Sequence, residues 1–256
     1  MNTAPVPDHL SHSSVALFLG CARQWKANYL DGIPRRISDA LLKGRTIDIL
    51  ATHNWEQKRD TGRDITLTEA EDVAEDTYRT EVDDAGGRAE IDWGRSTFTS
   101  ALESVLRMAR AHLLVHAPLY TPKATQLEVR RPIEGSRRYF VGHLDALLDD
   151  GTVIDVKTSG RKLDPKAADT ELQPTAYAYA LGHPITFEFL RLVDNGRMPV
   201  YAEKVTTTRG QAAIDWYALN LEAIELAINA GSFPASPSWR CGHCSIAPSC
   251  IKRMQE

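Results

Sequence analysis

Two hydrophobic patterns divide the chain near residue 118. Before that point apolar residues recur at helical spacing and predict helices over 15–30, 40–58, 68–84 and 95–116. After it, short apolar runs bounded by Gly, Asp and Pro predict strands over 125–132, 139–148, 153–158, 185–193 and 200–206, and helices over 167–181 and 211–230. Residues 1–13 show neither pattern, so we expect them to form a loose tail.

The order of these elements predicts an α/β fold, in which a mixed β-sheet is flanked by helices and a helical lobe is inserted before it. Ser14 is the expected N-cap of the first helix, and Thr68 with Glu71 forms the expected capping box of the third. The chain then divides into an N-terminal helix, a helical lobe, a sheet core and a C-terminal piece rich in Pro, Ser and Cys, over residues 1–30, 31–117, 118–231 and 232–256.

Two of the strands carry charged residues inside apolar runs. Asp145 lies on the strand at 139–148, and Asp155 and Lys157 lie on the next strand. A three-residue turn with Gly151 in the left-handed conformation would pair Asp145 with Asp155, at a Cβ separation of roughly 5 Å. Lys157 is two residues further along and shares that face. We therefore expect two carboxylates and one ammonium group on one side of a hairpin.

Two carboxylates at that separation repel each other unless a cation neutralises them. Mg²⁺ and Mn²⁺ prefer oxygen ligands, polarise a phosphodiester and lower the pKa of a bound water. Lys157 would orient the attacking water or stabilise charge in the transition state. The alternative interpretation of the hairpin alone is a solvent-facing strand edge with a surface ion pair.

Candidate supporting residues lie outside the hairpin. Gln173 and Tyr177 are four residues apart on one helix face, from which they would reach over the hairpin to a DNA backbone, although Tyr177 taken alone is better explained as a core residue. Pro174 predicts that this helix either begins or kinks near Gln173. Asp48 and His53 are further candidate metal ligands. About 140° around a helix separates them, so we do not expect both to bind one ion.

The four cysteines form a second group of candidate ligands. Cys241, Cys244 and Cys250 lie within ten residues at the end of the chain, and Cys21 is the only other cysteine. Four thiolates suit either zinc or an iron–sulfur cluster, and spacing alone does not decide between them. Either one would join the C-terminal piece to the first helix.

Composition narrows the choice of partners and compartment. The chain has 256 residues, of which 43% are hydrophobic and 25% charged, and a formal net charge of -4. A nucleic acid would therefore be held by local basic patches and bound metal rather than by a broadly basic surface. No apolar run reaches the roughly 20 residues of a membrane span, and residues 1–9 lack the pattern of a signal peptide. We expect a cytoplasmic protein, in which cysteines are more often ligands than disulfides.

Taken together, these residues resemble the RecB-like branch of the PD-(D/E)XK nuclease superfamily. Within that branch they look most like the iron–sulfur exonucleases of the CRISPR-associated Cas-four and AddB type, including phage versions. The matching pieces span almost the whole chain in the family's order: Cys21, Gly44-Arg45-Thr46-Ile47-Asp48, Gly142-x-x-Asp145, Asp155-Val156-Lys157, Gln173-x-x-x-Tyr177 and the terminal Cys-x2-Cys-x5-Cys.

The resemblance implies a restriction-endonuclease-like sheet and a role for each matching position. Asp145 and Asp155 would bind the catalytic metal, Lys157 would be the catalytic lysine, and Gln173 and Tyr177 would support the substrate. The cysteines would hold a [4Fe–4S] cluster in a C-terminal subdomain. One position departs from the family pattern, because Asp48 stands where a histidine is usual. Aspartate still binds a hard cation, and His53 is a substitute of poor geometry.

The leading hypothesis is thus a metal-dependent DNA exonuclease that acts on single-stranded DNA or DNA ends, with partners in recombination or CRISPR adaptation. A DNA-end binding subunit of a processing complex that has lost cleavage is the main alternative, supported by Asp48 and the acidic net charge. A zinc-stabilised protein without nuclease activity is a third. Oligomeric state, cleavage polarity and pathway do not follow from the sequence.

Overall fold

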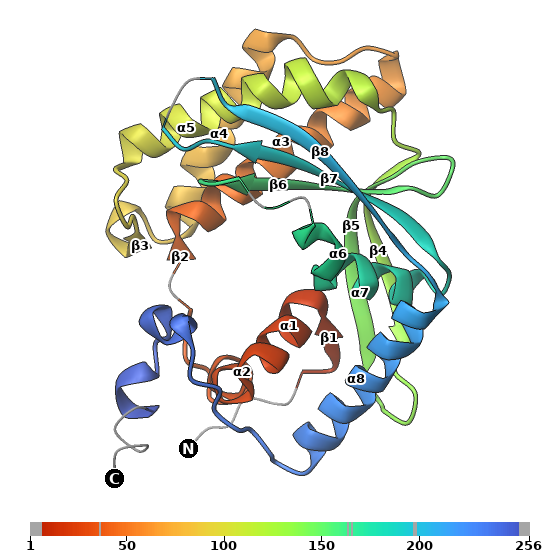
Figure 1. Cartoon of the computed structure of the whole chain (residues 1–256). Coiled ribbons are helices and arrows are strands. Elements are labelled where there is room, and N and C mark those ends of the chain that lie inside the picture. The colour runs from red at the N-terminus through yellow and green to blue at the C-terminus, as the bar shows by residue number, and fades with distance from the viewer. Residues whose placement is uncertain (1–6, 36, 163, 165, 197–198, 251–256) are drawn as a thin grey trace.

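A computed structural model describes residues 7–35, 37–162, 164, 166–196 and 199–250. Its centre is a six-stranded mixed sheet with the order β1-β5-β6-β7-β8, in which β4 also pairs with β5 (Figure 1). The strands are β1 (His9–Ser11), β4 (Ala124–Pro132), β5 (Tyr139–Leu147), β6 (Val153–Ser159), β7 (Ile185–Val193) and β8 (Tyr201–Arg209). The predicted mixed α/β fold is therefore confirmed.

Strand β5 has an unusual set of neighbours. At one edge it pairs with β4 at every residue except Asp145. At the other edge β1 pairs with residues 139–141 and β6 pairs only with residues 146–147. Residues 142–145 of β5 have no strand partner on this edge in the described part of the chain. The sheet therefore opens between β5 and β6, at the position of Asp145.

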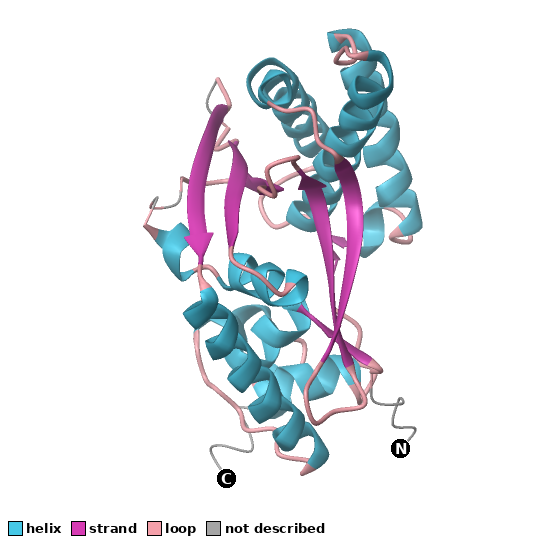
Figure 2. Cartoon of the chain, turned by 90° about the vertical axis from the view of Figure 1, so that its right-hand side faces the viewer, coloured by secondary structure: helices cyan, strands magenta, loops and turns pink. Residues whose placement is uncertain are grey.

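Helices cover both faces of the sheet, as Figures 1 and 2 show. On one face α3 (Asp39–Thr61), α4 (Leu67–Asp84) and α5 (Phe98–Ala111) share a core with strand residues that include Ile154, Val156 and Leu190. On the other face α1 (His12–Gly20), α7 (Leu172–Leu181) and α8 (Gln211–Asn229) pack around Phe140, Phe187 and their neighbours. The helices expected as a separate lobe thus contribute to one of the two cores of the sheet.

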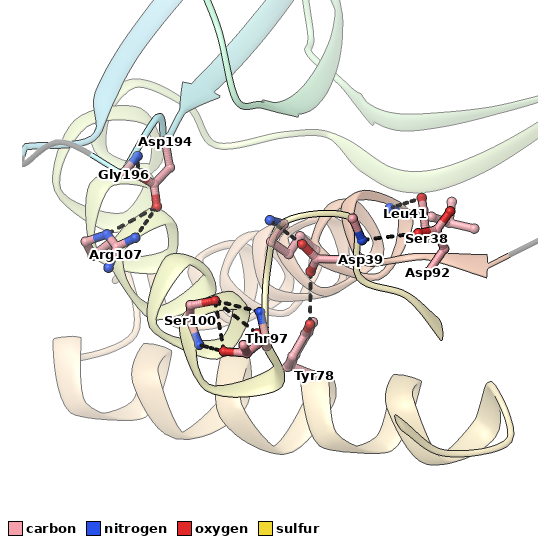
Figure 3. Close-up of polar contacts among 12 residues, drawn as sticks. Ser38, Asp39, Leu41, Tyr78, Asp92, Thr97, Ser100, Arg107, Asp194 and Gly196 are labelled. Carbon is pink, nitrogen blue, oxygen red and sulfur yellow. Dashed lines mark hydrogen bonds and ion pairs between the residues drawn. The ribbon is translucent and has the colours of Figure 1, made fainter. Parts of the chain in front are cut away.

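Polar contacts fix the three helices of the first face to one another and to the sheet (Figure 3). Tyr78 of α4 donates a hydrogen bond of 3.1 Å to buried Asp39 at the start of α3. Arg107 of α5 lies 2.6 Å from the Asp194 carboxylate, just after β7. A two-stranded sheet of β2 (Ile37–Ser38) and β3 (Ile91–Asp92) closes this part.

The C-terminal piece lies beside α2 (Ala22–Tyr29) at the bottom left of Figure 1. The backbone N–H of Arg23 donates to the carbonyl of Pro234 at 3.0 Å. A short 3₁₀ turn, η4 (Trp239–His243), follows Ser238. Residues far apart in sequence therefore meet at the start of α2.

Several helix boundaries differ from the prediction. The helix expected over 15–30 is two helices, because Cys21 is extended between α1 and α2, and the cap is Ser11 rather than Ser14. Thr66, not Thr68, caps α4. Part of the expected loose tail forms β1, which pairs with β5 and so gains the backbone hydrogen bonds that local sequence does not reveal.

Two other predicted helices are also interrupted. The one at 167–181 breaks at Glu171 into α6 (Ala167–Thr170) and α7, so Pro174 lies in the first turn of α7, where its missing N–H costs nothing. The one at 95–116 begins at Phe98 after the Thr97 capping box, and from His112 to His116 it is a π-helical segment followed by the 3₁₀ turn Ala117–Leu119.

Candidate active site

The turn of the β5–β6 hairpin has the predicted form. Gly151 has a φ of 84°, in the left-handed region that favours glycine, and Leu148 N–H donates to the Thr152 carbonyl at 2.9 Å. The register pairs Ala146 with Ile154. Continued by one step, it would place Asp145 opposite Asp155, but the ladder ends at Ala146. The direct cross-strand pair is therefore not formed.

The Asp145 side chain replaces the missing ladder bond. In this register the next hydrogen-bonded pair would be Leu144 with Val156, because such pairs alternate along an antiparallel ladder. Instead Val156 N–H donates to Oδ2 of Asp145 at 2.9 Å. The carboxylate thus sits between two diverging strands, and its position is fixed by a backbone donor.

Asp155 is held from two sides. Its side chain is only 1% exposed. Lys157 Nζ lies 2.7 Å from Oδ2, and Gln173 Nε2 donates to Oδ1 at 2.6 Å. A buried carboxylate needs such partners to stay ionised. The lysine side chain is partly exposed, whereas the carboxylate that its ammonium group contacts is buried.

Gln173 and Tyr177 support this carboxylate from α7. Gln173 Nε2 also lies 3.1 Å from the Tyr177 hydroxyl, and that hydroxyl donates to the carbonyl of His143 at 2.5 Å. A Cβ at Gly142 would come within 3.3 Å of the Tyr177 ring, so glycine is needed for the ring to lie against β5. Both α7 side chains are buried and engaged inside the protein, whereas we expected them over the hairpin as contacts to a DNA backbone.

Asp48 on α3 faces the same group, and His53 does not join it. Burial, followed by the nearby Asp155 carboxylate, raises the pKa of Asp48. Gln126 Nε2 donates to Asp48 at 3.1 Å. His53 Nε2 instead lies 3.6 Å from Glu69 of α4. The helix geometry that separates Asp48 from His53 thus holds in the structure.

The electrostatics describe three carboxylates gathered around one ammonium group. The pKa of Asp145 is raised well above its usual range by burial and then by the Asp155 and Asp48 carboxylates. Burial lowers the pKa of Lys157, but Asp155 and Asp145 more than offset this effect, so the pKa is raised and the lysine is a cation at neutral pH. A cation added to this group would relieve the repulsion among the carboxylates.

Sequence reasoning missed three residues at this site. Gln126 on β4 has a φ of 47°, the only positive value at a non-glycine residue of the described chain, and nothing in its local sequence signals this. His12 at the start of α1 lies near Lys157, and burial and that ammonium lower its pKa to about 4. Arg191 of β7 pairs in register with Lys157. Its position in the apolar run 185–193 was a signal, because a cation there needs a reason.

The donor set fits a hard cation held partly by solvent and substrate. In the part of the chain that the structure describes, no three His, Cys, Asp or Glu side chains are close enough to hold one ion by themselves. Mg²⁺ is usually held by one or two carboxylates together with waters and substrate phosphates. Asp145 and Asp155, with Asp48 nearby, meet that requirement.

The four cysteines line a single cavity between α2 and the C-terminal piece. Cys21 Sγ accepts the Ser236 N–H and Cys241 Sγ accepts the Ser238 N–H, both at 3.5 Å. Cys244 and Cys250 complete the lining, and all four thiols are free. The cavity therefore gathers four thiols from opposite ends of the chain, although within the described residues they are not packed tightly enough to hold a single ion as they stand.

A mixed sheet flanked by helices, opened at an aspartate and carrying a buried aspartate and a lysine on the next strand, defines a nuclease core. The family model of the PD-(D/E)XK nuclease superfamily matches residues 9–251, so the chain belongs to that superfamily. Membership of the superfamily is thus confirmed, and it supports a nuclease, with DNA as the substrate that the family implies.

Solved structures agree with this fold. A protein named "Putative exonuclease" from Eubacterium rectale superimposes with a TM-score of 0.63 over 94% of this chain and 88% of its own, at 14% sequence identity. The structure of SSO0001 gives a TM-score of 0.37 at 14% identity over 84% of each chain, a likeness too weak to carry an argument. Among curated protein sequences there is no significant match. No helix in the described ranges is long and apolar enough to cross a membrane.

Proposed function

We propose that the protein is a metal-dependent DNA exonuclease that hydrolyses phosphodiester bonds of single-stranded DNA or DNA ends. The observation that carries this proposal is the group formed by Asp145, Asp155 and Lys157 where β5 and β6 diverge. The preference for single strands or ends, and the RecB-like Cas-four or AddB type with a possible phage origin, rest on the sequence resemblance.

Asp145 and Asp155, with Asp48, would hold Mg²⁺ or Mn²⁺. When bound, such an ion supplies Lewis-acid polarisation of the phosphodiester and lowers the pKa of water. Lys157 contributes a fixed positive charge, which stabilises the negative charge that develops on the phosphate. Gln173 holds Asp155 in one orientation through Oδ1, which leaves Oδ2 directed towards the lysine.

The test compares the wild type with Asp155→Asn and Asp155→Ala. The asparagine variant keeps the shape of the buried side chain and removes only its charge. Asp83→Asn, at an exposed position of α4, is a matched control. We expect Mn²⁺-dependent degradation of DNA labelled at either end to be lost in both Asp155 variants and retained in the control. Undiminished cleavage by folded Asp155→Asn would overturn the proposal, and the two labels report polarity.

We further propose that Cys21, Cys241, Cys244 and Cys250 hold a [4Fe–4S] cluster. Support comes from the shared cavity and from the two N–H donors on its thiols, since hydrogen bonds to sulfur accompany cluster sites. Anaerobically purified protein should be brown and contain iron and sulfide, and Cys21→Ser should lose both. A colourless preparation containing zinc would favour a zinc site instead.

A second function is a DNA-end binding subunit of a recombination or CRISPR-adaptation complex that cleaves weakly. Asp48, at a position where the family usually has histidine, favours it. Asp48→His separates the two functions. If the subunit is weakened by this residue, the histidine variant should cleave labelled single-stranded DNA with Mn²⁺ faster than the wild type. Equal or lower activity would count against weakening at this position.

A further inference from the structure

Arg191 is a buried cation that forms no ion pair within the described residues. It lies in the middle of β7 and is 3% exposed. Its Nε and Nη1 atoms are buried and have no hydrogen-bond partner in the described chain, and no ion pair is formed by its guanidinium there. The ring of Phe189 lies 5.2 Å from the guanidinium carbon, which is a favourable but weak contact.

Arg209, the other buried arginine of the described chain, is fully engaged, and so is part-buried Arg138, so the burial of Arg191 needs a separate explanation. Arg209 donates to Thr175, Thr207 and several backbone carbonyls. Arg138 is paired with Glu225. An uncompensated buried charge is strongly destabilising, and proteins keep one only where something else neutralises it. Glu203 lies opposite Arg191 on β8, but no ion pair between the two is formed in the described chain, so the guanidinium can take an anionic ligand.

Arg191 lines a cavity of about 150 Å³. Roughly 10–15 Å³ of such volume is enough for one water, so the cavity has room for a larger polar group. Its lining combines three cations, two hydroxyls and one carboxylate with apolar Phe189 and Val193: Lys157, Arg161, Arg191, Thr158, Ser159 and Glu171 are the charged and hydroxyl residues. Lys157 and Gln173 also line it, so the cavity is continuous with the Asp155 site.

We propose that this cavity binds a phosphate of the DNA backbone next to the phosphate that is cleaved, with Arg191 as its principal ligand. The inference rests on the proposed function. Arg191 pairs in register with Lys157 on the neighbouring strand, so its guanidinium lies one strand away from the catalytic lysine. A guanidinium fork matches two phosphate oxygens, which an ammonium cannot do. The cavity thus positions the DNA strand, while Asp155 and Lys157 act on the adjoining phosphodiester.

Binding is tested without cleavage. Arg191→Met keeps the length of the side chain and removes its charge, and Arg59→Met, at the exposed end of α3, is the matched control. Fluorescence anisotropy with single-stranded DNA in EDTA should show that only Arg191→Met weakens binding, by about 10- to 100-fold, the range of a charge-assisted hydrogen-bond pair. Inorganic phosphate should raise the melting temperature of the wild type and the control, but not of Arg191→Met.

Stability separates a ligand-binding role from a structural one. In phosphate-free buffer Arg191→Met should melt at the same temperature as the wild type or higher, because it removes an uncompensated buried charge. A lower melting temperature with unchanged DNA and phosphate binding would overturn the proposal. If Arg191→Met abolishes the stabilisation by inorganic phosphate but binds DNA as tightly as the wild type, the assignment of this cavity to DNA would be overturned. These measurements need no nuclease activity, so they remain decisive even if the protein does not cleave.

A cleavage experiment locates the DNA phosphate that Arg191 binds. Neutral methylphosphonates are placed one at a time along a labelled strand, and cleavage by Mn²⁺-loaded wild type is compared with cleavage by Arg191→Met. A methylphosphonate at one position next to the cleaved bond should slow cleavage by the wild type and leave cleavage by the already slow variant unchanged. Equal slowing of both proteins at every position would show that Arg191 contacts no backbone phosphate.

Discussion

Replacing the two buried histidines of the π-helical segment should make the fold resistant to mild acid. His112 is 0% and His116 1% exposed, and their rings lie 5.7 Å apart in the core shared by α3 and α5. Neither nitrogen of His112 has a hydrogen-bond partner within the described residues. Burial, and then His116, lowers the pKa of His112 to about 3, and burial lowers that of His116 to about 4.

The direction of the pH effect on stability follows from proton binding. In the folded protein both rings stay neutral until the pH approaches 4, whereas the unfolded chain takes up protons below its ordinary histidine pKa of about 6.5. The unfolded state therefore binds more protons between these values, and stability is lost as pH falls through this window. At about pH 5 each histidine lowers the free energy of unfolding by about 2 kcal/mol, so the pair lowers it by about 4 kcal/mol.

The assay is urea unfolding of the wild type and of a variant carrying His112→Leu and His116→Leu. Leucine is similar in volume and leaves no polar atom in the core. The quantity of interest is the change in the free energy of unfolding between about pH 7.5 and about pH 5. This change should be about 4 kcal/mol smaller in the variant. His183→Leu, at an exposed position, is the control and should behave like the wild type.

The carboxylates are the same in every protein compared, so their titration cancels in the difference. Parallel loss of stability in the wild type and the double variant would refute the reasoning, since it would mean that neither histidine is held neutral by the fold. If the variant is less stable than the wild type at neutral pH, this loss reflects altered packing. It does not affect the change in free energy of unfolding between the two pH values, which is the quantity tested.

Two further substitutions test the support of the active site. Gly142→Ala should cost about 1–3 kcal/mol of stability, measured by urea unfolding, and should reduce DNA digestion, because its Cβ would lie 3.3 Å from the Tyr177 ring. Gln126→Gly should be about 1 kcal/mol more stable than Gln126→Ala, because glycine tolerates the positive φ. Both Gln126 variants should need more Mn²⁺ for half-maximal cleavage, because each loses the hydrogen bond to Asp48. Equal stability of the two, or an unchanged Mn²⁺ requirement, would contradict this account.

Local sequence was sufficient where the determining interactions are local. The β5–β6 turn follows from Gly151 and its neighbours, and the register follows from the turn. The alternation of apolar residues placed β4, β5, β6, β7 and β8 within a few residues of their observed bounds. Pro174 marked the first turn of α7 for the same local reason.

Tertiary contacts determined what local patterns did not contain. Three residues, His9–Ser11, form a strand only because the first three residues of β5 offer an open edge, and one expected helix breaks at Cys21, beside the C-terminal piece. The burial of Gln173 against Asp155 depends on how α7 packs on the sheet, so sequence spacing identified the residue but not the contact it makes inside the protein.

The sequence by itself determined the superfamily, the order of elements and the identity of the charged residues on the hairpin, because these depend on residue type and short spacing. Only the tertiary structure decided that Asp145 accepts a hydrogen bond from Val156, that Gln126 contacts Asp48, and that Arg191 is buried with two guanidinium nitrogens unpaired within the described residues. Each of these contacts depends on side chains that folding brings together from distant segments. Because burying a charge is costly, a buried charged residue stands out once the structure shows which groups surround it.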